Sequence, residues 1–395
     1  MTTCLYNARV LTMDNDRTID RGGVVFDSDI SQVFEGDPHV EHQRADTMVD
    51  ARGRVVMPAF VDAHTHACWG GHRLDEFDMK LKGATYLELL EAGGGIMSTV
   101  RDTRAASEDE LVESLGHRLN AMLREGTTTV EIKSGYGLTT DDELKMLRAI
   151  RRAGLLWQGE VVPTACIGHA LDPDQTGFVQ RTIHETLDAV HDEFPGIAID
   201  AYTEQGAWTF DDTVRLFERA MDLGHPVRVH TDQFNELGMT RWAVDHGARS
   251  VDHLEATSPD ELDRVAKSDT LAVMLPCSGF QVDGRYADGR AFLDACPEGN
   301  NLVIATNYNP GSAPTSSMPF AIALSTRHLR ITAHEAIRAC TTNAARLLGL
   351  TDRGTITKGV RADLVMLRHT DERMLGYEFG GNPVDHVWCA GEQVT

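Results

Sequence analysis

The stretch Phe60-Val61-Asp62-Ala63-His64-Thr65-His66 begins as a short apolar strand and ends in two histidines separated by one residue. On an extended segment, residues i and i+2 point to the same side, so both imidazoles can reach one ion. Similar apolar or β-branched runs recur along the middle of the chain. The expected strands are residues 60–64, 127–133, 160–166, 197–203, 227–230, 250–253, 271–276 and 302–306.

Helical patterns fill most of the gaps between these strands. Thr332 and Glu335 have the spacing of a capping box, as do Thr140 and Glu143. Apolar residues at helical spacing follow the second of these pairs. Strands alternating with helices eight times over about 250 residues predict an α/β fold, a (β/α)8 TIM-like barrel.

The two ends of the chain differ from this middle. Short β-type runs broken by Gly, Asp and Asn fill residues 1–56, and similar runs fill residues 357–395. Chain termini often lie close together, so the two ends can pair. We therefore expect residues 1–56 plus 357–395 to form a small composite β-sandwich domain beside a barrel over residues 57–356.

Composition limits the partners of the chain. Lys and Arg number 37 and Asp and Glu number 60, which gives a formal net charge of −23. Such a surface repels phosphate, so we expect no nucleic-acid or membrane partner, although a local arginine can still bind an anionic small molecule. The seven scattered cysteines contain no C-x-x-C pair and indicate no disulfide framework. With no signal segment and no long apolar run, the expected location is the cytoplasm.

Histidines end or follow several expected strands. His64 and His66 follow the first strand, His169 the third, His230 the fifth and His253 the sixth. Any one of them alone is more often a hydrogen-bonded core or surface residue than a ligand. In a barrel of this type, however, the active site lies where the carboxyl ends of the strands converge. Their joint placement at these ends predicts a site for one metal ion.

Longer motifs resemble the amidohydrolase superfamily and, within it, the imidazolonepropionases. The resemblance covers nearly the whole chain. It rests on Pro58-Ala59-Phe60-Val61-Asp62-Ala63-His64-Thr65-His66, Gly70-Gly71-His72-Arg73-Leu74-Asp75-Glu76-Phe77, Ala92-Gly93-Gly94-Gly95-Ile96, Glu131-Ile132-Lys133-Ser134-Gly135-Tyr136-Gly137-Leu138, and Asn309-Pro310-Gly311-Ser312 with Ser317-Met318.

The resemblance implies an activity and a set of roles. The activity is hydrolysis of the ring amide C–N bond of 4-imidazolone-5-propanoate to N-formimidoyl-L-glutamate in histidine degradation, by a homodimer with one divalent Zn or Fe ion per chain. The implied metal ligands are His64, His66, His230 and Asn307. The implied catalytic residues are His253, Asn307 and Gln233. The implied substrate contacts are Arg73, Tyr136, His169, Gln233, Asn309, Gly311 and Ser312.

The residues alone give an alternative interpretation of Arg73 and further expectations for Tyr136 and His169. The planar guanidinium of Arg73 can hold the substrate propionate in two hydrogen bonds. Without the resemblance, Arg73 is a loop arginine paired with Asp75 or Glu76. Tyr136 lies between two glycines on a sharp turn, where we expect its phenol to be exposed. The segment before His169 is one residue shorter than in the family, which leaves the register of His169 open.

Two positions depart from the family pattern. The family has Asp, a metal ligand and proton acceptor, where this chain has Asn307, and many members have Glu in place of Gln233. An amide cannot take a proton at neutral pH, and loss of a general base commonly costs about 10²–10⁴ in rate. Glu204 is then the nearest remaining strand-end carboxylate. Three explanations are open: an engineered Asp→Asn substitution, which the intact 309–312 loop favours, another base, or a paralogue with altered function.

Other functions therefore compete with imidazolonepropionate hydrolysis. One alternative is that the chain acts as a different hydrolase of cyclic amidines or cyclic amides, or as a deaminase, within the same superfamily. Another is non-catalytic binding of the same ligand, for which Asn307 is suited. Arg73, Tyr136 and the 309–312 loop favour a small ring with a carboxylate tail, and hence the first function.

Overall fold

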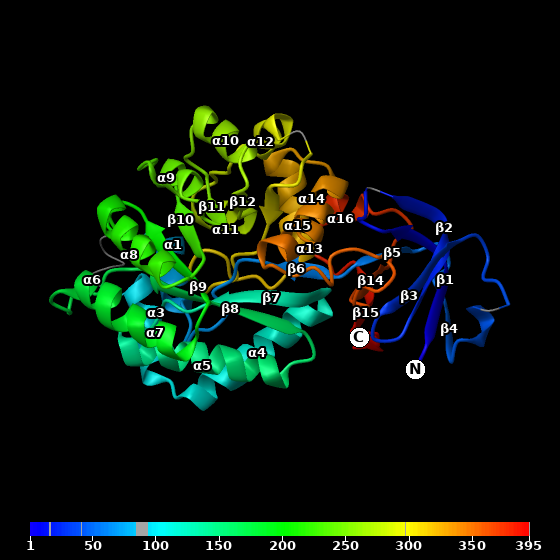
Figure 1. Cartoon of the computed structure of the whole chain (residues 1–395), viewed down its shortest axis with the longest axis horizontal. Coiled ribbons are helices and arrows are strands. Elements are labelled where there is room, and N and C mark those ends of the chain that lie inside the picture. Colours follow the sequence, from blue (N-terminus) through cyan, green and yellow to red (C-terminus); the bar gives the residue numbers. More distant parts are fainter. Residues whose placement is uncertain (16, 41, 84–93, 297, 395) are drawn as a thin grey trace.

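The larger part of the molecule is a barrel of parallel strands surrounded by helices (Figure 1). The computed structural model describes all residues except 16, 41, 84–93, 297 and 395. Within this described part, eight strands lie side by side in the order in which they occur in the chain. They are β6 (Phe60–Asp62), β7 (Thr127–Lys133), β8 (Glu160–Gly168), β9 (Ala198–Thr203), β10 (Val227–Thr231), β11 (Ser250–His253), β12 (Leu271–Met274) and β13 (Leu302–Ile304).

The first and last barrel strands are joined by the residues that follow them. The backbone N–H of Asn307 donates to the carbonyl of His64 at 3.0 Å. The N–H and hydroxyl of Thr306 donate to the Asp62 carboxylate at 3.1 and 2.5 Å. Both Asp62 and Thr306 are fully buried. These bonds bring the end of β6 and the end of β13 together immediately below the polar strand ends.

Amphipathic helices cover the outside of the barrel. In α8, for example, Leu216, Phe217 and Ala220 are buried while the opposite face is charged. The expected capping box is present at the start of α14, where Thr332 and Glu335 each accept the backbone N–H of the other. The helices are α1 (Leu74–Leu81), α3 (Ile96–Ala105), α4 (Glu108–Arg124), α5 (Thr140–Leu156), α6 (Phe178–Arg181), α7 (Leu187–Glu193), α8 (Phe210–Asp222), α9 (Met239–Asp245), α10 (Pro259–Ala266), α11 (Pro276–Val282), α12 (Gly289–Ala295), α13 (Met318–Leu324), α14 (Ala333–Ala339), α15 (Thr342–Leu347) and α16 (Met374–Tyr377).

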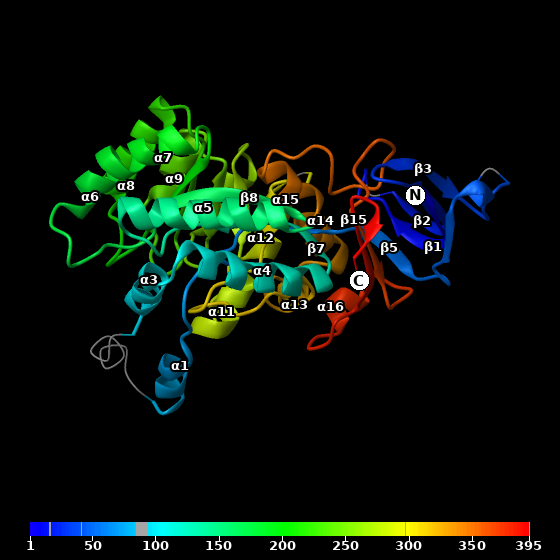
Figure 2. The same cartoon turned by 90° about the horizontal axis from the view of Figure 1, so that it is seen from below.

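Strands from both ends of the chain form a second sheet beside the barrel (Figures 1 and 2). The ends meet where β5 pairs antiparallel with β14, with Pro58 opposite Leu364. Only Ala59 separates β5 from β6, so the histidine-bearing stretch is anchored in both sheets. The strands are β1 (Thr3–Leu11), β2 (Thr18–Phe26), β3 (Ile30–Glu35), β4 (Thr47–Asp50), β5 (Val55–Pro58), β14 (Leu364–Leu367), β15 (Val384–Cys389) and β16 (Glu392–Gln393).

This architecture confirms the expected α/β barrel with a small β domain built from both chain ends, while the domain limits 1–56 plus 357–395 and 57–356 stay predictions. Several strands end earlier than expected: β6 stops at Asp62 and β13 at Ile304. Three residues after the end of β13, Asn307 adopts a left-handed conformation, with φ of 57°. Within the described ranges, no helix is both long and apolar enough to cross a membrane.

The closure between β6 and β13 is testable by removing one hydroxyl. Thr306→Val removes the donor to the buried Asp62 carboxylate, so we expect the free energy of unfolding to fall by about 1–3 kcal/mol. Thr306→Ser keeps the hydroxyl and serves as the control. Urea unfolding followed by circular dichroism measures both. A valine variant as stable as the unchanged chain would show that this bond does not contribute to barrel closure.

Candidate metal centre and active site

Three histidines converge at the carboxyl end of the barrel. His64 and His66 follow β6, and His230 lies in β10; one ring nitrogen of each is within 4.8 Å of the others. The Nε2 atoms of His66 and His230 are 3.1 Å apart. The Nε2 atom of His64 is buried and has no hydrogen-bond partner among the described residues. Ring nitrogens that face one point with no protein donor between them are suited to a metal ion.

Two buried carboxylates determine which nitrogen of the His64 and His230 rings faces that point. Asp252 lies 2.5 Å from Nδ1 of His64, and Asp200 lies 2.9 Å from Nδ1 of His230. Each carboxylate accepts the Nδ1 proton, which leaves Nε2 with a free electron pair. Burial lowers the pKa of His64, His66 and His230 below the ordinary histidine value. The rings are therefore neutral, the form that binds a metal.

Two buried cations hold these carboxylates in turn. Lys133 donates to Asp200 and to Glu131, each at 2.7 Å. Arg228 donates to Asp252 at 2.8 Å and to the same Glu131 at 3.1 Å. Burial acts to lower the pKa of Lys133, but the surrounding carboxylates hold this pKa above its ordinary value. The ammonium therefore keeps its charge. An uninterrupted chain of buried charges thus runs from His230 to His64.

A cavity of about 620 Å³ opens above the histidines, which is within the usual size range of small-molecule sites. His64 lies beneath this cavity, and the other residues singled out from the sequence line it. The structure therefore brings the whole predicted set together. The lining members of that set are His66, Arg73, Tyr136, His169, His230, Gln233, His253, Asn307, Asn309, Gly311 and Ser312.

Arg73 enters the cavity with one edge of its guanidinium already bound. Its Nε and Nη2 donate to the Glu76 carboxylate at 2.7 and 2.5 Å. Lys80 and the backbone N–H of Gly95 also donate to Glu76, at 2.9 and 2.8 Å. The Nη1 side faces Gly311, where a Cβ atom would lie only 2.7 Å from Nη1. Arg73 is thus both a paired loop arginine and a cavity residue, with its Nη1 edge available to an anion.

Tyr136 is buried, with 4% of its surface exposed, so the expectation of an exposed phenol is wrong. The reason is the turn that carries it. The carboxylate of Glu143 accepts the backbone N–H groups of Gly135, Gly137 and Leu138 at 2.8–3.0 Å. These three hydrogen bonds hold the turn against the start of α5, so the Tyr136 ring becomes part of the cavity wall.

The role of Glu143 also corrects the expected capping box at Thr140. The N-cap of α5 is Thr139, whose hydroxyl accepts the backbone N–H of Asp142 at 3.1 Å. Thr140 is instead the first residue of the helix. The expected N-cap is therefore one residue too late in the sequence. Glu143 accepts backbone N–H groups from the turn that carries Tyr136 instead of capping the helix.

His169 follows β8 and reaches the cavity despite its shorter segment. Its ring stacks on His66 with centroids 4.5 Å apart, and its Nδ1 lies 3.0 Å from the carbonyl of Gly135. Burial lowers the pKa of His169 to about 3. The neutral ring donates its Nδ1 proton to that carbonyl, so Nε2 is an acceptor available to a ligand.

Gln233 and Glu204 have different surroundings. The hydroxyl of Tyr202 donates to Oε1 of Gln233 at 2.9 Å, which fixes that oxygen and leaves the amide NH₂ to donate. Glu204 lines the cavity, but its carboxylate accepts from the backbone N–H groups of Gln205, Phe234 and Asn235 and from the Asn235 side chain. Glu204 therefore anchors the loop after β10, which makes it a poor replacement for a base.

His253 and Asn307 complete the cavity wall next to the histidine cluster. Nδ1 of His253 lies 3.2 Å from the Glu255 carboxylate, which leaves Nε2 as the ring nitrogen available to a ligand. The Asn309 amide holds the loop beside Asn307: it donates to the Asn307 carbonyl at 2.6 Å and to the Ser312 hydroxyl at 2.9 Å. The Asn307 side chain itself faces the cavity.

Comparison with known proteins agrees with this geometry. The profile of the amidohydrolase family matches residues 55–394. The imidazolonepropionase of Herpetosiphon aurantiacus is 42% identical over 363 residues, 89% of this chain and 84% of that protein. That of Paracoccus denitrificans is 38% identical over 402 residues, 99% of both chains. The chain belongs to the imidazolonepropionase family of the amidohydrolases.

Solved structures related to this family member share its fold. A triazine hydrolase variant superposes with a TM-score of 0.76 at 18% identity, covering 99% of this chain and 94% of that one. An adenosine deaminase from Xanthomonas campestris with bound zinc gives a TM-score of 0.69 at 18% identity, covering 99% and 92%. At this identity the likeness concerns the fold alone.

Sequence reasoning missed four residues that hold the site in place: Asp200, Asp252, Arg228 and Glu255. A signal for the first three is present in the sequence, since each is a charged residue inside an apolar central strand. Such residues are almost never fully buried unless paired. Glu255 gives no such signal, because it lies in a loop after β11.

The carboxylate behind His64 offers a test of the metal centre. Asp252→Asn removes the negative charge of the group whose Oδ2 accepts both the His64 Nδ1–H and an Arg228 N–H, so the His64 ring loses its anionic partner. Loss of such a partner typically weakens metal binding by about 10–100-fold. We expect this loss in competition titrations of Zn²⁺ against a chelator, with thermal unfolding of the apo-protein measured in parallel. His64→Ala supplies the reference for loss of a ligand, and unchanged affinity in both variants would contradict the site.

Proposed function

We propose that the protein hydrolyses the ring amide C–N bond of 4-imidazolone-5-propanoate to N-formimidoyl-L-glutamate. One observation carries the proposal: a single cavity places the available edge of Arg73 above three converging histidines. The identity of 38–42% to several imidazolonepropionases supports it. The substrate combines a small ring with a propionate, which matches a cavity lined by the cations Arg73 and Lys80 and by several neutral hydrogen-bonding groups.

His64, His66 and His230 would hold one divalent ion, with the Asn307 side-chain oxygen as a weaker fourth ligand. The buried Nε2 of His64, which has no partner in the described part of the chain, fits this assignment. Neutral imidazoles suit both zinc and iron. When bound, such an ion lowers the pKa of a coordinated water and polarises a carbonyl.

The remaining residues orient the substrate. Arg73, fixed by Glu76, binds the propionate through its Nη1 edge. The Nε2 atom of His169 accepts a ring N–H, and the NH₂ group of Gln233 donates to a ring acceptor. Tyr136 and the loop residues Asn309, Gly311 and Ser312 supply further neutral contacts from the cavity wall.

Proton transfer is the step for which this chain is least equipped. Asn307 and Gln233 are amides, and the Glu204 carboxylate is fully engaged. We assign His253 to polarising the ring carbonyl. The Nδ1–H of His253 donates to Glu255, so its Nε2 can first take the proton of the attacking water and, once protonated, donate a hydrogen bond to the ring carbonyl oxygen.

The same lack of a carboxylate base favours a second candidate function, binding of the ligand without turnover. The substrate-orienting residues do not depend on a base at position 307. A chain of this kind would bind imidazolonepropionate and release it unchanged. Turnover assays with mass-spectrometric detection of formimidoylglutamate distinguish the two functions.

We also propose that the protein acts in the cytoplasm, as a homodimer, on an anionic small molecule rather than on nucleic acid or a membrane. The cysteines Cys4, Cys68, Cys166, Cys277, Cys296, Cys340 and Cys389 are all free and buried, which suits a reducing compartment. The net charge of −23 opposes binding to phosphate-rich polymers.

Substitution of Arg73 tests the binding of the propionate. Arg73→Met leaves the carboxylate without its charged partner, so we expect KM for imidazolonepropionate to rise at least about tenfold. A ring analogue without the carboxylate should lose far less. Steady-state kinetics on both substrates measure the difference. Equal losses on the two substrates would mean that Arg73 is structural.

Substitution at position 307 tests the assignment of the base. Asn307→Asp restores a carboxylate that can accept and return a proton, so we expect kcat to rise at least about 10²-fold with little change in substrate affinity. Affinity is measured separately by calorimetry with a non-reacting analogue. If the unchanged chain turns over at a rate that Asp does not improve, the base lies elsewhere, and His253→Gln is then the variant that must abolish turnover.

A further inference from the structure

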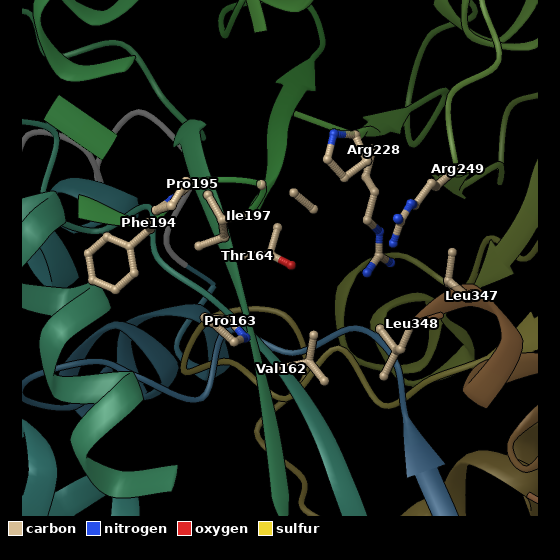
Figure 3. Close-up of a pocket in the computed structure, with 13 residues that line it drawn as sticks. Val162, Pro163, Thr164, Phe194, Pro195, Ile197, Arg228, Arg249, Leu347 and Leu348 are labelled. Atoms are coloured by element: carbon tan, nitrogen blue, oxygen red, sulfur yellow. The ribbon is translucent and has the colours of Figure 1, made fainter. Parts of the chain in front are cut away.

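A second cavity, of about 360 Å³, lies at the opposite end of the barrel (Figure 3). Its walls come from the early part of β8, the segment between α7 and β9, the start of β10 and the end of α15. Barrels of this type perform their chemistry at the carboxyl ends of the strands. This cavity opens at the amino-terminal ends and is therefore separate from the site above.

Most of the cavity wall is apolar. Pro163, Ile197 and Leu348 lie around it, with Val162 and Leu347 beside them (Figure 3). Its volume falls within the range of small-molecule sites, which are mostly apolar with a few polar groups that fix orientation. The wall is suited to a short aliphatic or aromatic body.

The charged groups of this cavity are two guanidinium groups, and Thr164 adds a hydroxyl. Arg249, the residue before β11, is exposed, and its guanidinium has no hydrogen-bond or ion-pair partner among the described residues. It lies near Gly349, just past the end of α15, but makes no bond to the helix carbonyls. Arg228 is buried, and four of its five N–H groups have acceptors: Ser250, Glu131, Ala63 and Asp252.

The convergence of these two arginines has a physical consequence. Figure 3 shows both side chains reaching the same side of the cavity. The charge of Arg228 is offset by the Glu131 and Asp252 carboxylates, whereas no described residue pairs with the Arg249 guanidinium, so Arg249 keeps an uncompensated positive charge beside the cavity. A bound anion would pair with this charge, and a planar guanidinium matches a carboxylate in two hydrogen bonds.

We propose that this cavity binds a small organic carboxylate. The carboxylate group pairs with Arg249 beside Arg228, and the apolar body packs against Pro163, Ile197 and Leu348. The apolar wall favours an organic acid over an inorganic anion, which would leave that surface exposed to water. The site is separate from the histidine cavity, because the two cavities share no lining residue.

Calorimetry with hexanoate tests the proposal on the full-length, metal-loaded protein. Hexanamide has the same body without the charge, and we expect it to bind at least about tenfold more weakly than hexanoate. Arg249→Gln should weaken hexanoate binding by a similar factor. Arg215→Gln, which removes an exposed arginine on α8, is the matched control and should leave the affinity unchanged.

A second variant separates this site from the catalytic cavity, which also holds a cation. Hexanoate binding should survive in Arg73→Met. The proposal is overturned if hexanoate does not bind, if hexanamide binds equally well, or if binding is lost in Arg73→Met but kept in Arg249→Gln. Binding of inorganic phosphate but not hexanoate, with the same dependence on Arg249, would overturn the assignment of an organic ligand.

Discussion

The buried pairing of Lys133 and Arg228 with three carboxylates is the constraint on which the site depends. Moving an ion out of water costs several kcal/mol, and only well-placed partners with satisfied hydrogen bonds offset that cost. Here both cations share Glu131, and each also holds the carboxylate behind one histidine. These residues come from β7, β9, β10 and β11, so the network can form only when four strands have their native register. The same network is therefore required both for the native register of the barrel strands and for the orientation of His64 and His230.

The strands and the His-x-His pair could be predicted because their signals are local. A short apolar run followed by a polar end is visible within about ten residues, and alternation with helices then implies a barrel. The network beneath could not be predicted in the same way. Asp200 and Asp252 can be identified as charged residues in apolar strands, but their partners lie 30 and 188 residues away in the chain. Sequence spacing contains no information about which histidine each carboxylate meets.

Two glutamates show a subtler limit of sequence reasoning. Glu143 has the spacing of a capping residue, yet it accepts three backbone N–H groups from the turn that carries Tyr136. Glu76 has the spacing of a partner for Arg73, and the structure shows that pairing, but the pair lines a cavity rather than facing solvent alone. In both cases the residue type and local spacing were informative. The role of each glutamate depends on its tertiary contacts, which the local sequence pattern does not describe.

At position 307 the backbone contributes to the fold, whereas the side chain contributes to the chemistry of the cavity. Its backbone has φ of 57°, a left-handed conformation that asparagine and aspartate both tolerate better than most residues. Its fold-stabilising bonds, to the His64 carbonyl and from the Asn309 amide, involve only the backbone. Other non-glycine residues with positive φ, including Asp232, His253 and Leu254, also follow or end barrel strands, as expected where strain is retained at a functional site. The side chain at 307 can therefore change from carboxylate to amide without disturbing the barrel, while the cavity beside it loses the group best able to accept a proton.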